Sequence, residues 1–237
     1  MIDIHTHILP QVDDGADSLE EAYEMVLTAV RSGVTALVAT PHSNLGWNSW
    51  GDESRKQEKA FTNLEKILIR EKVPLKLYRG MEIWSSVDMV EKIKAGQLIT
   101  LNHTPHVLIE FGVEEESWWI EAIIEELRGA GLIPVLAHPE RYFCVQEEPT
   151  LLYEWRELGA LAQMNKGSIL GRFGSEIRRT AEVLLRNHLF TCIASDAHHA
   201  YIRTTDMKEL QYYLQKYCSL TEQDELLRKN PSAILQI

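Results

Sequence analysis

The sequence is poor in cysteine and has no long hydrophobic run. Its three cysteines, Cys144, Cys192 and Cys218, form no close pair, which argues against a disulfide framework or a thiolate zinc site. Apolar runs such as Val34–Ala39 fall far short of the roughly 20 residues that a membrane span needs. Basic residues are also scarce, since 24 lysines and arginines face 35 aspartates and glutamates, for a formal net charge of −11. This field disfavours binding of nucleic acid or anionic lipid.

The amino-terminal residues Met1–His5 lack a basic segment followed by an apolar stretch, so the sequence predicts no signal peptide and a cytoplasmic location. Of the 237 residues, 45% are hydrophobic and 25% are charged, which is the usage of a globular protein. No repeat or flexible linker interrupts the chain. We therefore expect a single domain over residues 1–237, while the oligomeric state stays open.

Short β-rich runs alternate with amphipathic helical stretches from end to end. Seven candidate strands are Ile2–His5, Thr35–Thr40, Lys76–Ile83, Val107–Phe111, Ile133–Ala137, Leu161–Asn165 and Phe190–Ser195. The candidate helices are Leu19–Arg31, Lys56–Arg70, Trp118–Ala130, Thr150–Glu157, Ser175–Arg186 and Met207–Tyr217. This alternation predicts an α/β fold with parallel strands, either a doubly wound sheet or a barrel.

Metal-ligand residue types gather at the carboxyl ends of these candidate strands. Together with Asp14 in a polar turn, the candidate ligands are His5, His7, Asp14, His42, Glu82, Glu110, His138, Asp196 and His198. Carboxyl ends of barrel strands converge on one mouth, whereas outer strands of a flat sheet could not meet. The site therefore favours a closed or nearly closed barrel.

The chemistry of these side chains narrows the kind of site. In His5-Thr6-His7, both imidazoles lie on the same side of an extended chain, because side chains alternate with period two. Imidazole and carboxylate without thiolate suit Mn, Fe or Zn. Nine ligands are too many for one ion, so two or three divalent ions are expected. Such a centre would be cationic, which implies an anionic substrate such as a phosphate ester.

Several short motifs resemble the polymerase and histidinol phosphatase (PHP) family. They are His-x-His at 5–7, Thr-Pro-His at 40–42, Gly-Met-Glu-Ile at 80–83, Ile-Glu-Phe at 109–111, Ala-His-Pro-Glu-Arg at 137–141 and Ser-Asp-Ala-His at 195–198. The opening Met-Ile-Asp-Ile-His and the Val-Asp-Asp-Gly stretch resemble, more narrowly, bacterial protein-tyrosine phosphatases of capsule and exopolysaccharide synthesis. The resemblance covers essentially the whole chain.

The resemblance implies a distorted (β/α)7 TIM-like barrel with a trinuclear, usually manganese-dependent site, in which the nine candidates are the ligands and Glu110 bridges two ions. It implies a phosphatase that hydrolyses phosphotyrosine on the tail of a bacterial tyrosine autokinase. Arg141 and Arg203 match phosphate-gripping arginines of the family, a task that suits the guanidinium fork. In our mechanistic hypothesis, a metal-bridged hydroxide attacks phosphorus directly, without a cysteine intermediate.

Three further assignments rest on single residues and not on a motif. Trp47 could pack a phenol ring at the pocket mouth, Asn165 could position substrate or cap a strand end, and His198 could supply a proton to the leaving group. Other readings remain open. They are a histidinol-phosphate or other small phosphomonoester phosphatase, a 3′–5′ nuclease, an amidohydrolase, and a catalytically inactive metal-binding regulator of the kinase.

Overall fold

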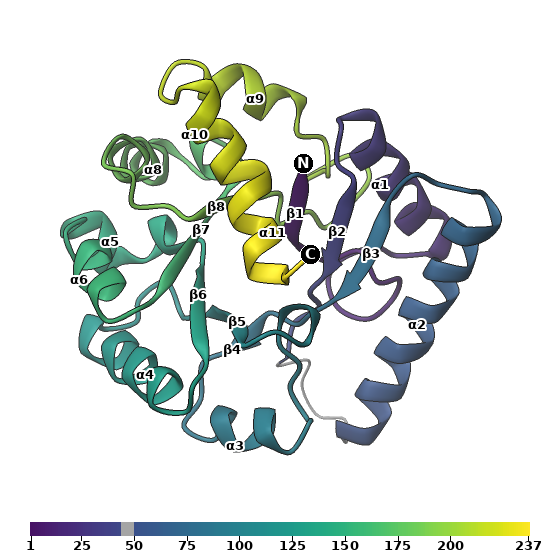
Figure 1. Cartoon of the computed structure of the whole chain (residues 1–237), viewed down its shortest axis with the longest axis horizontal. Coiled ribbons are helices and arrows are strands. Elements are labelled where there is room, and N and C mark those ends of the chain that lie inside the picture. Colours follow the sequence, from purple (N-terminus) through teal and green to yellow (C-terminus); the bar gives the residue numbers. More distant parts are fainter. Residues whose placement is uncertain (44–49) are drawn as a thin grey trace.

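A computed structural model describes residues 1–43 and 50–237, with side chains in the second range from residue 53 onward. Strand segments alternate with helices in chain order (Figure 1). The strands are β1 Ile2–Thr6, β2 Ala36–Ala39, β3 Lys76–Arg79, β4 Ile83–Trp84, β5 His106–Glu110, β6 Ile133–Ala137, β7 Leu161–Asn165 and β8 Cys192–Ala194. The predicted α/β class is confirmed.

The longer helices pack around the outside of the strands in Figure 1. The α-helices are α1 Leu19–Arg31, α2 Trp50–Arg70, α3 Met89–Lys94, α4 Ser117–Gly129, α5 Phe143–Glu147, α6 Leu151–Glu157, α7 Lys166–Ile169, α8 Ser175–Arg186, α9 Lys208–Leu214, α10 Leu220–Asp224 and α11 Asn230–Leu235. Short helical turns lie at Leu101–His103 (η1), Pro139–Arg141 (η2) and Glu225–Lys229 (η3). Within the described ranges, no helix is long and apolar enough to cross a bilayer.

The predicted third strand, Lys76–Ile83, is wrong in one respect, because the structure divides it in two. Its first part, β3, is the last strand of a parallel sheet with the order β1-β2-β3. Its second part, β4, is the first strand of a parallel sheet with the order β4-β5-β6-β7-β8. Gly80 lies at the break. A Cβ there would lie 2.8 Å from Val38 Cγ1 and 2.9 Å from Leu101 Cδ2, so only glycine lets the chain pass so closely.

Isolated bridges join the two sheets on both sides. Thr6 pairs with Ala197 just beyond β8, where the His7 amide donates to the Ala197 carbonyl at 2.8 Å. On the other side, His42 pairs with Glu82 across the break. Eight strand segments therefore occupy seven positions around a ring, which agrees with the predicted distorted barrel.

Helix boundaries follow local signals where these are strong. Helix α1 begins and ends as predicted, because the Ser18 side chain accepts a hydrogen bond from the Glu21 amide at 3.1 Å and caps its first turn. Helix α2 instead starts at Trp50, six residues before the predicted Lys56. The sequence predicts none of the short helices α3, α5, α7, α10 and α11, since segments of four to six residues carry too little periodicity to recognise.

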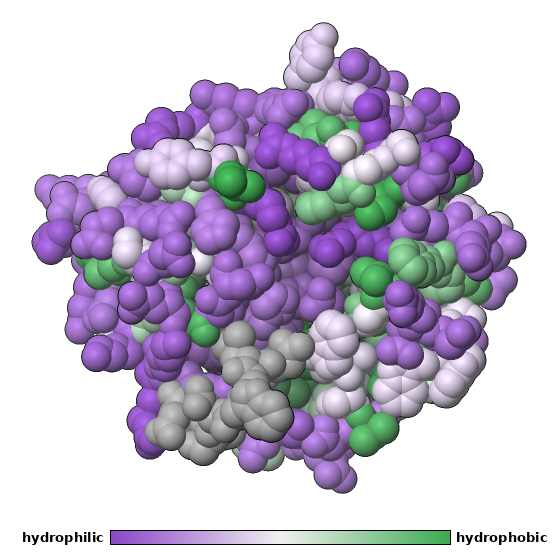
Figure 2. Space-filling view, turned by 180° about the vertical axis from the view of Figure 1, so that it is seen from behind, coloured by the Kyte–Doolittle hydropathy of each residue, from purple (hydrophilic) through white to green (hydrophobic). Residues whose placement is uncertain are grey.

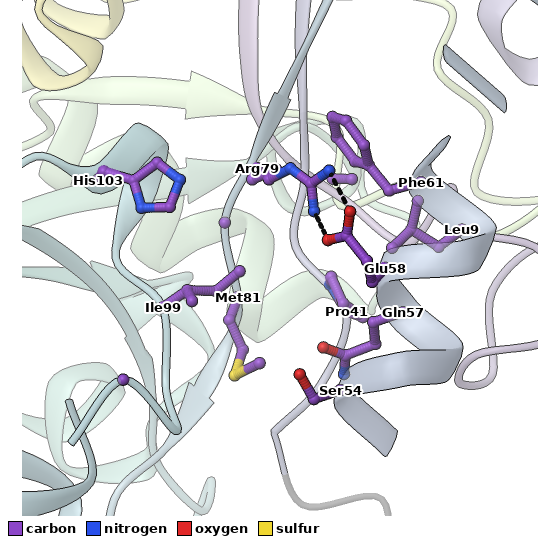
Figure 3. Close-up of a pocket in the computed structure, with 13 residues that line it drawn as sticks. Leu9, Pro41, Ser54, Gln57, Glu58, Phe61, Arg79, Met81, Ile99 and His103 are labelled. Atoms are coloured by element: carbon purple, nitrogen blue, oxygen red, sulfur yellow. Dashed lines mark hydrogen bonds and ion pairs between the residues drawn. The ribbon is translucent and has the colours of Figure 1, made fainter. Parts of the chain in front are cut away.

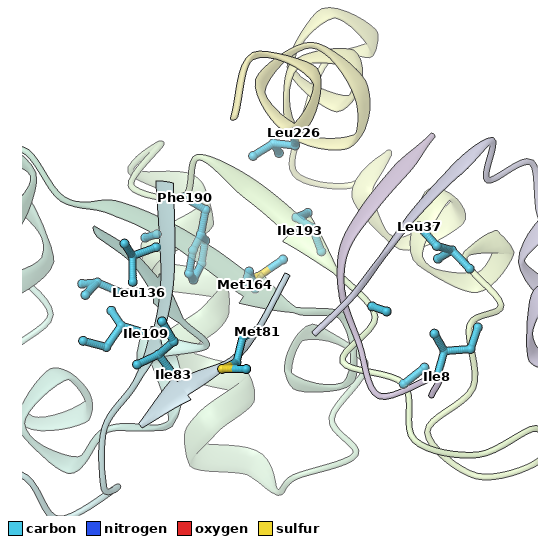
Figure 4. Packing of buried hydrophobic residues seen from close by; sticks show 14 of the residues in the cluster. Ile8, Leu37, Met81, Ile83, Ile109, Leu136, Met164, Phe190, Ile193 and Leu226 are labelled. Atoms are coloured by element: carbon cyan, nitrogen blue, oxygen red, sulfur yellow. The ribbon is translucent and has the colours of Figure 1, made fainter. Parts of the chain in front are cut away.

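The core has two parts. The larger cluster contains strand residues such as Leu37, Ile109 and Leu136, which Figure 4 shows, together with buried residues of the surrounding helices. The smaller cluster joins residues of β1, β2, β5, β6 and β8 to Ile234 and Leu235 of α11. Helix α11 lies across the strands in Figure 1, so this end of the barrel is closed by apolar side chains and the polar residues are left to the other end.

Candidate metal centre

The nine candidate ligands, which come from well-separated parts of the chain, meet at the end of the barrel opposite α11. They form four overlapping groups, and within each group the donor atoms all lie within 4.8 Å of one another. The groups are His7, Asp14, His42 and His198; His5, His7 and Asp196; His5, Glu82 and His138; and His42, Glu82 and Glu110. Figure 2 shows this face, which has a mainly hydrophilic hollow near its centre. The structure thus brings all nine predicted residues together.

Glu82 lies at the middle of this arrangement. Its Oε1 is 3.2 Å from both His5 Nε2 and His138 Nε2. Its Oε2 is 3.2 Å from His7 Nε2 and 3.0 Å from His42 Nδ1. The side chain is only 1% exposed. Glu82 therefore lies between the groups, and Glu110 shares one group with it and His42, while the bridging of two ions by Glu110 stays a prediction.

The two carboxylate oxygens of Asp196 contact different groups. Its Oδ1 lies 3.6 Å from His5 Nε2 and 3.5 Å from His7 Nε2. Its Oδ2 accepts a hydrogen bond from Arg203 Nη2 at 2.7 Å and another from the Asn165 side-chain amide. One carboxylate therefore links the imidazoles to the predicted phosphate-binding arginines.

Two side chains that sequence reasoning did not assign fix the tautomers of the paired imidazoles. His5 Nδ1 lies 2.9 Å from Gln163 Oε1, and His7 Nδ1 lies 2.8 Å from Asp13 Oδ2. Both partners are acceptors, so each Nδ1 carries a proton, and in the neutral ring each Nε2 has a lone pair that points inward. Gln163 could have been found from its period-two spacing with Asn165 on β7, and Asp13 from its place beside Asp14.

The inward-facing atoms fit divalent cations. The two Nε2 atoms of His5 and His7 are 3.2 Å apart, with carboxylate oxygens at similar distances and no donor group between them. Ligands about 2.1 Å from a shared ion lie roughly 3.0–3.4 Å apart at octahedral or tetrahedral angles. Converging lone pairs and carboxylates repel one another unless a cation lies among them, and the donor spacing here suits one.

The electrostatics of the protein without ions point the same way. Burial lowers the pKa of His5, but Glu82 and Asp196 outweigh it and raise the pKa to about 8. Burial and the neighbouring Glu82 raise the pKa of Glu110 to about 7. Burial and Arg141 lower the pKa of His138 to about 4. His5 and Glu110 therefore hold protons where cations would otherwise compensate the carboxylates, whereas His138 is kept in the neutral form that binds a metal.

Asp14 lies on the open side of the centre, beside the buried His198. Asp14 Oδ1 lies 3.4 Å from His198 Nε2 and 3.6 Å from His42 Nε2, although the Asp14 side chain is 66% exposed. A hydrogen bond with His198 lowers the pKa of Asp14. This part of the site is the one that a molecule from solution would meet first.

The arginines lie at the rim. Arg141 and Arg203 have side chains 25% and 32% exposed, and Arg141 Nη1 is 3.7 Å from Asp196 Oδ2. Asn165 is 1% exposed, and besides donating to Asp196 it accepts from the Gly167 amide at 2.7 Å, capping α7. Both polar groups of Asn165 are thus engaged within the protein, which favours a role in orienting Asp196 over direct substrate contact. The predicted substrate contact of Trp47 lies outside the described residues.

Three residues of the candidate site have an unusual backbone conformation. His138, Asp196 and Arg203 have φ values of 37°, 49° and 50°, in the left-handed region that non-glycine residues rarely adopt. Such conformations persist only where the surrounding structure holds them, and they are concentrated at functional sites. Three of them in one cluster support the view that this end of the barrel is built for binding.

A separate cavity of about 170 Å³ lies behind the strand break (Figure 3). At its edge, Arg79 Nη2 donates to Glu58 Oε1 at 2.9 Å, and the Arg79 guanidinium carbon is 4.0 Å from the centroid of the Phe61 ring. The described residues that line the cavity include none of the nine candidate ligands. The ion pair ties α2 to β3, so we attribute a structural role to this region.

The fold and the assembled donors define a class, namely α/β barrels with a candidate polynuclear metal centre. Residues 1–236 match the family described as "Capsular polysaccharide synthesis, CpsB/CapC", and the chain belongs to that family. Tyrosine-protein phosphatase YwqE of Bacillus subtilis (strain 168) is 38% identical over 242 residues, which cover 100% of this chain and 94% of that protein. Tyrosine-protein phosphatase CpsB of Streptococcus pneumoniae is 29% identical over 240 residues, which cover 99% of this chain and 98% of that protein.

Solved structures agree with the sequence matches. One described as "Crystal structures of YwqE from Bacillus subtilis and CpsB from Streptococcus pneumoniae, unique metal-dependent tyrosine phosphatases" has a TM-score of 0.90 at 36% identity, covering 100% of this chain and 94% of that chain. Histidinol phosphate phosphatase from Lactococcus lactis has a TM-score of 0.58 at 12% identity, covering 92% and 94%. That second likeness concerns the fold alone, and it agrees with the predicted barrel.

Proposed function

We propose that this chain is a metal-dependent protein-tyrosine phosphatase, a single PHP-type domain over residues 1–237 that hydrolyses phosphotyrosine. The observation that carries the proposal is the convergence of nine nitrogen and oxygen donors beside two arginines. The similarity over essentially full length to proteins named tyrosine-protein phosphatases supports the choice of substrate.

The proposed cofactor is manganese, as two or three ions held by His5, His7, Asp14, His42, Glu82, Glu110, His138, Asp196 and His198. Imidazole and carboxylate donors suit Mn, Fe and Zn, and the resemblance to usually manganese-dependent enzymes favours manganese among them. Divalent cations in such a centre activate water as a nucleophile and neutralise the charge of a phosphoryl group.

Arg141 and Arg203 bind the phosphate group of the substrate. Both guanidinium groups now lie near Asp196 Oδ2, at 3.7 Å and 2.7 Å, and both are partly exposed to the hollow. A phosphate oxygen can accept their remaining N–H donors in the forked geometry that suits guanidinium. Charge that develops on the equatorial oxygens in the transition state strengthens these hydrogen bonds, so the arginines act mainly on turnover.

The cysteines do not supply the nucleophile. Cys192 is fully buried, and burial raises the pKa of the thiols of Cys144, Cys192 and Cys218 above the ordinary value. A catalytic thiolate requires the opposite shift. Tyrosine leaves as a phenolate whose pKa is about 10, so the need for a general acid is modest, and any proton from the protein would come from His198, which lies beside the exposed Asp14.

The proposed physiological substrate is the phosphotyrosine-bearing tail of a bacterial tyrosine autokinase that regulates capsule or exopolysaccharide synthesis. The family description names capsular polysaccharide synthesis, which supports that setting. Kinase tails are phosphorylated where ATP is available, so we place the reaction in the cytoplasm. The net charge of −11 disfavours nucleic acid as a partner.

The test compares manganese-reconstituted protein on three substrates, a phosphotyrosyl peptide, histidinol phosphate and single-stranded DNA, with Glu82→Gln as the inactive control. We expect a preference of at least about tenfold in kcat/KM for the peptide, which corresponds to about 1.4 kcal/mol of transition-state discrimination. Preference for histidinol phosphate would replace the proposal with the related small-molecule phosphatase. Absence of turnover on every phosphoester would point to an inactive metal-binding regulator.

A further inference from the structure

The segment that follows β7 contributes no candidate metal ligand, yet it lies against both arginines. The half-buried ring of Phe173 has its centroid 5.1 Å from the guanidinium carbon of Arg141 and 5.9 Å from that of Arg203. The two arginines come from different loops, after β6 and after β8. One aromatic ring therefore contacts two cationic groups that would otherwise repel each other.

The position of Phe173 depends on a close approach to α7. A Cβ at Gly167 would lie 2.6 Å from Phe173 Cε2 and 3.2 Å from Asn165 Oδ1. The first distance is shorter than any normal contact between carbon atoms, so glycine at 167 is what allows the ring to lie this deep. The same glycine donates its amide to Asn165, the residue that orients Asp196.

The backbone of the Arg203 loop is held independently. Lys166, which is 2% exposed, donates from Nζ to the carbonyl oxygens of Thr204 and, at 2.9 Å, Asp206. These bonds fix the loop but not the long side chain of Arg203, which is held by Asp196 Oδ2 on one side and the Phe173 ring on the other. Arg141 lies farther than Arg203 from Asp196 Oδ2, at 3.7 Å, but nearer to the Phe173 ring, at 5.1 Å.

Building on the proposed function, we propose that Phe173 is a positioning residue for phosphate recognition, whose ring holds the guanidinium groups of Arg141 and Arg203 so that both face one phosphate. The face of an aromatic ring attracts a cation and limits its rotamers, so a partly exposed arginine arrives oriented instead of being ordered by the substrate. Phe173 itself makes no contact with the reacting atoms in this scheme.

The experiment uses manganese-loaded protein and inorganic phosphate as the probe. Phe173→Leu removes the π face while keeping an apolar side chain, and Phe173→Tyr keeps the ring. We expect the leucine variant to bind phosphate at least about tenfold more weakly by calorimetry and to lose a similar factor in kcat/KM, whereas the tyrosine variant stays within about twofold of the wild type. Metal content should be unchanged in both.

A matched control tests whether any aromatic–cation pair has this effect. Tyr212→Leu removes a ring that lies 5.5 Å from Lys216 Nζ, outside the candidate site, and it should leave phosphate affinity unchanged. Combining Phe173→Leu with Arg203→Lys should cost less than the product of the two single losses, because both changes act on the same guanidinium contact.

The inference is overturned if Phe173→Leu keeps wild-type phosphate affinity, or if its metal content falls in parallel with its activity, which would indicate general damage to the fold. Phosphate titration needs no turnover, so the two proposals can fail separately. Weakened phosphate binding in a protein that does not hydrolyse phosphotyrosine would sustain the role of Phe173 and refute the proposed function.

Discussion

The two regions of the site are built in opposite ways. His5, His7 and Glu82 are at most 1% exposed, and each makes several contacts with other donors. Arg141 and Arg203 are 25% and 32% exposed and depend on one carboxylate oxygen and one aromatic ring. The buried donors are fixed in advance, as an ion with strict distance requirements needs, whereas the rim keeps freedom to receive and release a substrate.

Asp196 is where the two regions meet, since one oxygen faces the imidazoles and the other faces the arginines. Changes in the donor region should therefore affect metal content and activity together. Changes at the rim should affect activity alone. Each of the following predictions tests that division.

Glu82→Gln should have the largest effect. The amide keeps the size of the side chain but places a neutral group, with N–H donors, among four imidazoles. We expect loss of bound metal and a decrease in kcat/KM of at least about 10³-fold. Elemental analysis after gel filtration and a phosphotyrosyl-peptide assay measure the two quantities. Full metal content in this variant would remove Glu82 from the centre of the site.

Arg141→Ala should lower kcat about 10²-fold and leave metal content intact, because removing one preformed donor to a developing anion typically costs that much. The Arg141 side chain is 25% exposed, so the melting temperature should change little. Inductively coupled plasma analysis alongside steady-state kinetics checks the prediction. Loss of metal from this variant would break the distinction between rim and donors.

Asp13→Asn tests the support of the donors. Asp13 accepts from His7 Nδ1 at 2.8 Å and from the His42 amide at 3.1 Å. Outer partners of metal-bound histidines typically contribute 10–100-fold in metal affinity, so we expect weaker manganese binding in that range. Activity should return at high manganese concentration. A variant that stays inactive at saturating metal would show that Asp13 does more than orient His7.

The smallest effect concerns pH. The folded-state pKa of His5 is about 8, above its ordinary value of 6.5, so the stabilisation from its protonated form is complete below pH 6.5 and is lost as the pH rises through 8. Metal-free protein should therefore melt a few degrees lower at pH 8.5 than at pH 6.5. Manganese affinity should rise over the same interval, because protons no longer compete. Calorimetric scans with and without a chelator measure both trends.

The sequence was sufficient to predict the barrel and the nine converging side chains, because strand periodicity and ligand residue types are local signals. It was insufficient for the division of the third strand, which depends on how closely Gly80 passes Val38 and Leu101. The choice between Glu82 and Glu110 as the central carboxylate likewise depends on three-dimensional distances. Phe173 carries no sequence signal at all, since a lone aromatic residue in a loop is recognised only by what it touches.

The junction between the two sheets links metal binding to the local stability of the barrel. At the break in the third strand, the barrel is joined by the His42–Glu82 bridge, in which the Ser43 amide donates to the Glu82 carbonyl at 3.0 Å and the Glu82 amide to the Pro41 carbonyl at 3.1 Å. Two of the proposed ligands, His42 and Glu82, are thus also the residues whose backbones join the two sheets here. A cation held by both side chains would stabilise this junction. Its removal should therefore speed amide hydrogen exchange at Ser43 and Glu82 before exchange increases in the rest of the barrel.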